Sequence, residues 1–419
     1  MHSHNRWVFL ERVYDVADVA SSGRRALKTG VFVTIVEFTL GLLIVLVTLT
    51  GVLFVLVLPR QPFGVERLTL MVNSTVRLIF VGLSRFARSY ERKDAILAPT
   101  APVALLAQVL YWAASLVLGF GLMLIPTTHS FLRGLEQALT ALFTVGTIHD
   151  GGSANAAIDI WAGATWVIVV ALQIAYLPTL YSAFSRREAL VAMLESRAGA
   201  PAWGPELLAR HQLVGILDTL PDLYKDWEMW AADVAESHST YPILLFFRSP
   251  EAWLSWMLGL LAVLDAAALQ LSLSPTSAPS HARLVLRMGF TLTNRIATSL
   301  GWEVNFDPRP DAPIQLTFED FESAVAMLQR VGFPVERTAQ QAWPDFHGWR
   351  VNYEESMYHL TDRLLAPPAK WSGSRRYLRD TAVEPHRPPH RQPGSDPDIS
   401  YEKPLITAST WNLRRRSHP

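Results

Sequence analysis

Apolar residues occur in three long blocks, over residues 31–59, 101–129 and 153–185. The first block contains one charged residue, Glu37, the second contains none, and the third contains Asp159. A helix needs about 20 apolar residues to cross the hydrocarbon core of a bilayer, and each block is longer than that. The blocks therefore predict transmembrane helices. Buried helices of a soluble protein are the alternative, which three such blocks in one chain disfavour.

Residues 60–100 mix apolar and polar positions. Met71 and Ile79 are apolar, but Arg77 lies near the middle, and a central arginine costs at least about 2.5 kcal/mol on insertion into a bilayer. We therefore expect an amphipathic linker at the membrane interface or in the cytosol. A short fourth span over 66–86 is the alternative.

The basic stretch 85–93 indicates which side of the membrane its neighbours face. Arg85, Arg88 and Arg92 are flanked by Ser, Tyr, Glu and Lys rather than by apolar residues. This disfavours a voltage sensor, whose arginines lie in an apolar helix, and favours a cytoplasmic anchor.

With that stretch in the cytoplasm, an outer helix over 101–126 runs outward and an inner helix over 157–184 returns to Arg186 and Arg187. The N-terminus would then lie outside, although basic residues before the first block argue against that side. A fourth span would remove the conflict, and both orientations stay open. Residues 1–30 are too long and too charged for a signal peptide, so the first block is expected to remain as an anchor.

Residues 188–365 have apolar residues at helical spacing, interrupted by Pro and Gly, which predicts a helical cytosolic domain. The apolar run 254–273 contains Asp265, and we expect a buried helix of that domain; a further crossing is the alternative. Residues 366–419 are rich in Pro, Arg, His and Ser without periodicity. Such a segment cannot bury a core, so a disordered basic tail is expected.

Composition narrows the chemistry. The 419 residues carry no net charge and contain no cysteine, which gives no reason to expect nucleic acid as a partner and excludes disulfides and thiolate metal sites. No cofactor or metal site is predicted, and no spacing typical of a catalytic site occurs, so we expect no enzyme.

The segment between the outer and inner helices carries the chemistry. Residues 130–143 have helical periodicity but are too few for two crossings, and Thr144, Val145 and Gly146 follow at once. Unwound backbone is tolerated at membrane depth where it lines a water-filled path, and its carbonyls can then replace the hydration shell of an ion.

This order of span, short helix, Thr-Val-Gly and span resembles the pore module of the potassium-channel superfamily. The resemblance implies a re-entrant pore helix and filter within 130–152, a homotetramer in a lipid bilayer, and a permeant monovalent cation such as potassium. The implied filter residues are Thr144, Val145, Gly146, Thr147 and Ile148, and the implied pore-mouth residues are His149 and Asp150.

The filter departs from the family at its outer end. Thr147 stands where the family has an aromatic residue, and Ile148 stands where it has glycine. A β-branched residue is a backbone outlier at positive φ, so the outer carbonyl rings are not expected to have the potassium geometry. Asp150 follows one residue later than the acid of the family.

The inner helix has features of a pore lining. Gln173, Tyr176 and Thr179 recur at three-residue spacing, which predicts a polar face. Pro178 removes a backbone hydrogen bond and should kink or end the helix, so Leu177 and Pro178 are the candidate gate.

A wider resemblance extends over most of the chain. The phrases SYERKDAILAPTAPVALL, AYLPTLYSAFSRREALVAMLESRAGAP and WRVNYE resemble a bacterial family of uncharacterised proteins described as ion channels with a helical cytosolic domain. Within residues 188–365 a charged set is expected on the outer face of a helical bundle, with carboxylate–histidine catalysis as the alternative. An aromatic-polar set predicts a structural anchor of Trp faces packed around an Arg–Asp contact, with ligand binding as the alternative. The charged set is Asp226, Trp227, Glu228, Trp230, Glu236 and His238; the aromatic-polar set is Trp343, Asp345, Trp349, Arg350, Asn352 and Tyr353.

These inferences predict an all-α, multi-pass protein of the plasma or bacterial inner membrane. Its expected function is that of a cation-channel subunit with a degenerate filter, gated by an unidentified signal through residues 188–365. The alternative is a non-conducting membrane sensor or scaffold that keeps the pore fold, which the departures at Thr147 and Ile148 favour.

Overall fold

The computed structural model describes residues 32–57, 67–143 and 152–373, and within these ranges it contains helices and no strand. The all-α prediction is confirmed. The chain divides into two compact units. We call Met1–Val76 with Val103–Leu177 the apolar unit, and Arg77–Pro102 with Pro178–Pro419 the bundle unit.

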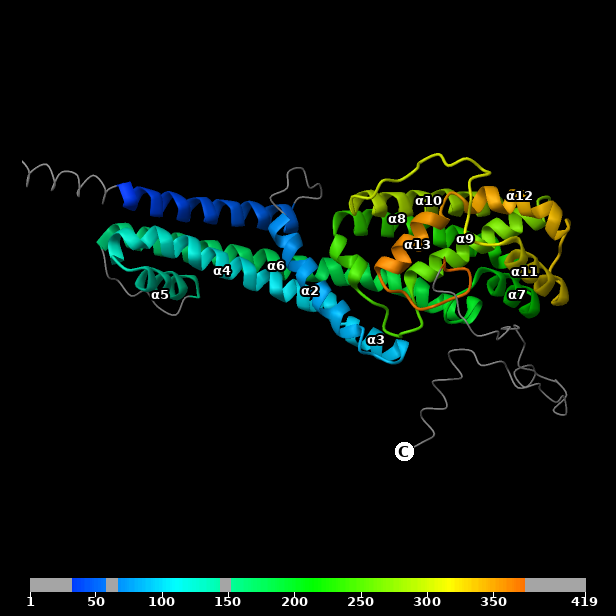
Figure 1. Ribbon diagram of the computed structural model, residues 1–419, viewed down its shortest axis with the longest axis horizontal. Helices are drawn as coiled ribbons and strands as arrows, with labels where there is room; N and C mark the ends of the chain where they lie inside the picture. Colours follow the sequence, from blue (N-terminus) through cyan, green and yellow to red (C-terminus); the bar gives the residue numbers. More distant parts are fainter. Residues whose placement is uncertain (1–31, 58–66, 144–151, 374–419) are drawn as a thin grey trace, which may run out of the picture. The chain divides into compact units, whose positions relative to one another are not determined.

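The apolar unit is built from long helices and one short one (Figure 1). Its described elements are the helix Phe32–Leu56, the start of α2 (Arg67–Ser84), most of α4 (Thr100–Thr128), α5 (Phe131–Leu142) and the first part of α6 (Gly152–Ala198). The first helix and α4 approach closely at Gly41 and Gly119, where a Cβ on Gly119 would lie 3.0 Å from the Gly41 carbonyl oxygen. Small residues permit such contact between apolar helices.

The core of the apolar unit consists of large side chains of α4 against its neighbours. Trp112, Leu116 and Phe120 are fully buried, and Val45 of the first helix and Leu142 of α5 pack in the same cluster. Other apolar side chains point outward, including Leu106 and Leu110, which are each 60% exposed. Water disfavours that arrangement and lipid does not.

Among the described residues, four helical stretches are long and apolar enough to cross a membrane. They are Phe32–Leu56, Tyr90–Thr128, Asn155–Ala198 and Trp256–Leu273. The last is α9, all 18 residues of which are buried by other helices of the bundle unit. The prediction of a buried helix over this run is therefore confirmed.

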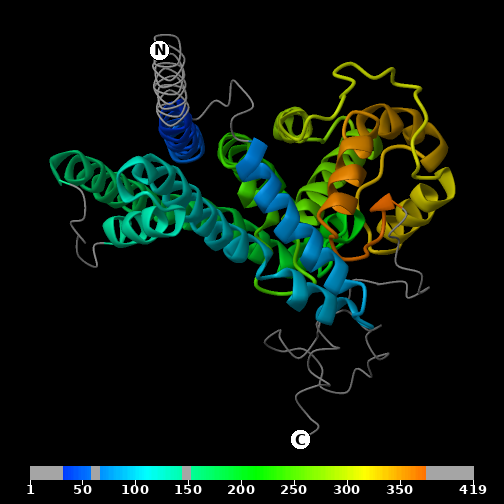
Figure 2. The same cartoon turned by 60° about the vertical axis from the view of Figure 1, so that its left-hand side comes forward.

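The bundle unit surrounds α9 with other helices (Figures 1 and 2). Figure 2 shows the yellow segment between α10 and α11 arching beside the orange α12 and α13. The remaining elements of this unit are α3 (Tyr90–Leu97), α7 (Gly204–Val214), η1 (Leu217–Thr219), α8 (Leu220–Thr240), η2 (Pro242–Phe246), α10 (Ser280–Ser299), α11 (Phe318–Arg330), α12 (Ala339–Arg350) and α13 (Glu354–Arg363).

Several predicted boundaries differ from the structure. The inner helix was expected over 157–184 with a kink or end at Pro178, but α6 continues through Pro178 to Ala198. A single proline removes one hydrogen bond, and the residues beyond it are good helix formers whose Val191 and Leu194 are buried. The ordered part also extends past 365, because Trp371 is buried. Residues 1–30 and 374–419 lie outside the described residues.

Candidate functional site

The short helix α5 is the element that the pore-module resemblance depends on. Its twelve residues extend about 18 Å, well short of the roughly 30 Å hydrocarbon core of a bilayer. One face carries Gln137, Ala138 and Ala141, which are buried, and the other carries Leu132, which is 74% exposed. This helix is therefore amphipathic and is held by one side.

The buried side of α5 meets α4 at two glycines. A Cβ on Gly134 would lie 2.6 Å from the carbonyl oxygen of Gly121, and a Cβ on Gly121 would lie 2.7 Å from Leu135 Cδ2. Real Cβ atoms do not approach a carbonyl oxygen so closely, so any side chain at Gly134 must push the two backbones apart. Glycine at both positions allows the close contact.

The same side of α5 is tied to α6 by a polar contact. Gln137 Nε2 donates to Asp159 Oδ2 at 2.9 Å, and both side chains are buried. The second oxygen of Asp159 has no hydrogen-bond partner among the described residues. A buried acid in an apolar helix is costly and needs such a partner. Together with the Gly121–Gly134 contact, this bond holds α5 between α4 and α6.

The predicted filter falls in a segment that the structure leaves undescribed. Thr144, Val145, Gly146, Thr147 and Ile148, and the pore-mouth residues His149 and Asp150, lie outside the described residues. In the described part, α5 ends at Leu142 and α6 begins at Gly152.

The predicted pore-lining residues do not share one exposed face. Gln173 and Tyr176 are 8% and 6% exposed, whereas Thr179 and Pro178 are exposed and Leu177 is half-buried. Which of them face an axis shared by four chains is a property of the assembly, so the pore lining and the gate stay predictions. Three-residue steps fall short of a helical turn of about 3.6 residues, which rotates Thr179 away from Gln173.

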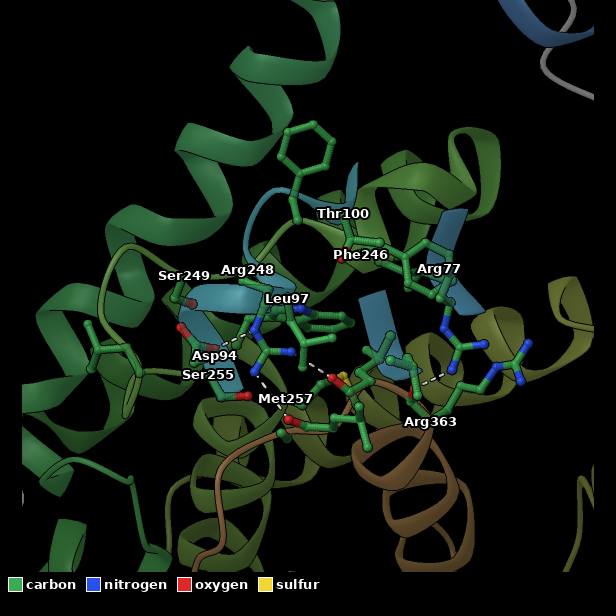
Figure 3. Close-up of a pocket in the computed structure, with 18 residues that line it drawn as sticks. Arg77, Asp94, Leu97, Thr100, Phe246, Arg248, Ser249, Ser255, Met257 and Arg363 are labelled. Atoms are coloured by element: carbon green, nitrogen blue, oxygen red, sulfur yellow. Dashed lines mark hydrogen bonds and ion pairs between the residues drawn. The ribbon is translucent and has the colours of Figure 1, made fainter. Parts of the chain in front are cut away.

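A second candidate site lies wholly in the bundle unit, where Arg248 joins α3 to the end of α13 (Figure 3). The Arg248 guanidinium pairs with Asp94 of α3 and donates to the Tyr90 hydroxyl at 2.6 Å. It also donates to the carbonyl oxygens of Leu364 at 2.8 Å and Leu365 at 3.1 Å. We call this cluster the Arg248 joint.

The end of α13 explains why arginines gather there. The last carbonyls of a helix have no partner within it and carry partial negative charge, so cations stabilise them. Arg77 of α2 donates to the Arg363 carbonyl at 2.7 Å and lies over the Phe246 ring at 5.4 Å. Arg77, the charged residue near the middle of 66–86, therefore has a specific partner in the bundle unit.

The space enclosed by the Arg248 joint is too small for a ligand. Its volume is about 50 Å³, whereas small-molecule sites have roughly 300 Å³ or more. Next to it, Trp253 Nε1 donates to Glu91 Oε1 at 3.1 Å, and the Tyr90 and Trp253 rings lie 5.3 Å apart. This site is therefore a connection between helices.

The predicted Arg–Asp contact within the aromatic-polar set exists, but with a different aspartate. Arg350 is fully buried and donates to Asp265 Oδ1 at 2.5 Å and to Glu354 Oε2 at 2.6 Å. Asp345 instead pairs with Arg337 on the surface. Trp371 lies over the Arg350 guanidinium at 5.5 Å, and its carbonyl accepts a hydrogen bond from Arg350 at 2.8 Å. Arg350 therefore supplies the counter-charge that allows Asp265 to lie in an apolar helix.

In the charged set of α8, Asp226 and Glu236 are exposed, as on the outer face of a bundle, whereas His238 lies inside. His238 is buried, and its Nε2 lies 3.0 Å from Nη1 of the buried Arg187. Because arginine can only donate, this nitrogen accepts and the proton resides on Nδ1, which lies 3.0 Å from Ser237 Oγ. Burial, with Arg187 adding to it, holds the pKa of His238 well below its ordinary value. In the described ranges no group of three His, Cys, Asp or Glu residues is placed to hold a metal.

Comparisons of the sequence with models of protein families and with curated proteins, and of the fold with solved structures, found no match. The geometry of α5 and of the Arg248 joint is therefore the basis for any statement about function.

Proposed function

We propose that this chain is a subunit of a homotetrameric cation channel in a lipid bilayer, with the filter formed by residues 144–148. The observation that supports this most is the position of α5. A helix too short to cross a bilayer is held between the two long apolar helices α4 and α6, and the Thr144-Val145-Gly146 sequence follows its C-terminal end. A soluble protein has no need for such an arrangement among outward-pointing apolar side chains.

The bundle unit is proposed to gate this channel from the cytosol. The stretch Val103–Leu177, which contains most of α4, all of α5 and the start of α6, is connected at both ends to the bundle unit. On one side α3 is held by the Arg248 joint, and on the other α6 continues unbroken through Pro178. A rearrangement of the bundle therefore pulls on both helices that hold α5.

The test is cation flux through the purified protein in liposomes, measured with potassium and with sodium gradients. We expect flux of at least one of these cations, and a loss of that flux when Gly146→Ala is introduced. Gly51→Ala is the matched control, because a Cβ at Gly51 meets no atom within 4 Å. The channel proposal fails if a folded tetramer gives no flux under either gradient, or if both variants conduct as well as the original chain.

A non-conducting sensor built on the same fold is the competing proposal, favoured by Thr147 and Ile148 at the outer filter positions. It predicts a stable tetramer in which neither cation passes. Cross-linking in the membrane identifies the tetramer independently of flux, so the two proposals are separated by one pair of measurements.

A further inference from the structure

The bundle unit contains a second, much larger cavity away from the Arg248 joint. Its volume is about 780 Å³, and it lies between the segment that follows α10 and the α12–α13 turn. This segment is the yellow arch beside the orange helices in Figure 2. A volume in the range of roughly 300–1,000 Å³ suits a small organic ligand. We call this cavity the α13 cleft.

The lining of the α13 cleft has a one-sided charge. Among the described residues it includes Glu303, Glu354 and Glu355 but no lysine or arginine. Glu354 is already occupied, because its carboxylate accepts from Arg350 and from the backbone N–H of Gln315. The carboxylates of Glu303 and Glu355 are exposed, and no ion pair involves either of them among the described residues. The free charge in the cleft is therefore negative.

An aromatic surface accompanies these carboxylates. Trp302 is half-buried in the cleft lining, and its ring centroid lies 6.0 Å from that of His359. The face of an indole ring attracts a cation, and it does so more strongly where water is partly excluded. Two carboxylates beside an indole face disfavour an anion and add charge attraction for a cation.

We propose that the α13 cleft binds a small organic cation, with the cationic group between Trp302 and the carboxylates of Glu303 and Glu355. The site follows from the cavity, its charge and its aromatic wall, so it does not depend on whether the apolar unit conducts.

The position of the α13 cleft gives such a ligand a route to α3. The first turn of α13 contributes Glu354 and Glu355 to the cleft, and the carbonyls at its other end are held by Arg77 and Arg248. Ten residues, about 15 Å, separate the cleft from the Arg248 joint along one rigid helix. A ligand that shifts α13 therefore acts on the segment that leads into α4.

Binding is tested by calorimetry on the full-length protein in detergent, with benzyltrimethylammonium as the probe and benzenesulfonate as an anion of similar size. We expect one saturable site per chain for the cation and none for the anion. Trp302→Ala and the double variant Glu303→Gln with Glu355→Gln should each weaken cation binding tenfold or more. The double glutamine variant changes exposed side chains only and should keep the fold. It therefore tests the site even if the tryptophan variant fails to fold.

The matched controls are Phe306→Ala, an exposed aromatic residue outside the cleft lining, and Glu319→Gln on α11, which should bind as the original chain does. Absence of binding at millimolar probe, equal binding of the anion, or undiminished binding in the Trp302 and double glutamine variants would overturn the site. The last result would place the cation elsewhere, for example in a pore.

Hydrogen exchange of Tyr90–Leu97 reports the link along α13. Exchange there should change on binding, and no change with binding intact would overturn a regulatory role.

Discussion

Two arginines of the described residues, Arg187 and Arg350, are completely buried, and their surroundings show how the bundle unit tolerates them. Arg187 donates to Glu188 at 2.8 Å and to the carbonyls of Leu244 at 2.9 Å and Phe247 at 2.7 Å. A buried charge is stable only when a counter-charge and hydrogen bonds replace the water it loses. Both residues meet this condition, and both connect segments that are far apart in the sequence.

The first prediction concerns Arg350. Arg350→Met keeps the side-chain volume but leaves Asp265 and Glu354 buried without their counter-charge, and this should cost about 3–5 kcal/mol of folding free energy. Thermal unfolding in detergent, followed by tryptophan fluorescence, measures the loss. Arg309→Met is the control, because the Arg309–Asp311 pair is exposed at 83% and 70% and should contribute less than about 1 kcal/mol. Equal melting temperatures for the two variants would contradict the prediction.

The second prediction concerns pH. His238 stays neutral in the fold because its pKa is held well below 6.5, first by burial and then by Arg187. The unfolded chain takes up this proton near pH 6.5, so the stabilising contribution is complete above that pH and is lost as the pH falls below it. His238→Gln, which can still accept from Arg187, should reduce the decline in melting temperature between pH 7.5 and 5.5. His211, whose pKa is also lowered by burial, should preserve part of the decline.

At the scale of elements, hydrophobic periodicity predicted the helices but did not predict the contacts between them. The apolar blocks, the short helix after Ser130 and the buried run around Asp265 all follow from spacing along one segment. The partners of Asp265, Gly134 and Gln137 lie 85, 13 and 22 residues away, and spacing within one helix carries no information about them. Asp159 was the one residue whose sequence context indicated such a contact, because a lone charge in an apolar block needs a polar partner.

The end of α6 is a boundary that the local sequence placed too early. Pro178 predicted a kink or an end because proline removes a backbone hydrogen bond, but the helix does not end there, and tertiary contacts beyond it outweigh that cost. Arg187 and Val191, both buried in the bundle unit, hold the continuing helix. Local propensity therefore gave way to packing that only the folded bundle supplies.

The third prediction addresses how α5 is held. Gly134→Ala places a Cβ against the Gly121 carbonyl and should displace α5 from α4, lowering stability by about 1–3 kcal/mol as overpacking does. Gly51→Ala places the same methyl group in open space and should be neutral or slightly stabilising. Unfolding of both variants in one detergent gives the comparison, and flux in liposomes should fall only for the first. If the Gly134 variant is as stable as the Gly51 variant, the close contact is not required.

At the scale of the whole molecule, the chain passes between the two units after Val76, Pro102 and Leu177. The second and third passages bracket the segment that carries α5, so both ends of that segment are covalently connected to the bundle unit. Of the two connections, α6 is a continuous helix, whereas α3 depends on side-chain contacts at the Arg248 joint. The joint is therefore the connection that a mutation can release without unfolding the bundle.

The fourth prediction tests that release. Arg248→Met removes the partner of Asp94 and three further hydrogen bonds, each link to a charged group contributing about 1.5–3 kcal/mol. Hydrogen exchange of the α3 amides should accelerate by about tenfold or more, which corresponds to about 1.4 kcal/mol. Exchange in the middle of α9 should not change, because none of the hydrogen bonds of Arg248 involves that helix. Arg186→Met, which removes a surface pair with Asp233, is the matched control and should leave α3 unaffected.

Because α3 leads directly into α4, the Arg248 variant should also alter the dependence of flux on the state of the bundle. Accelerated exchange spread evenly over the bundle would instead mean that the joint is part of its general stability, and the proposed route from bundle to α4 would lose its support.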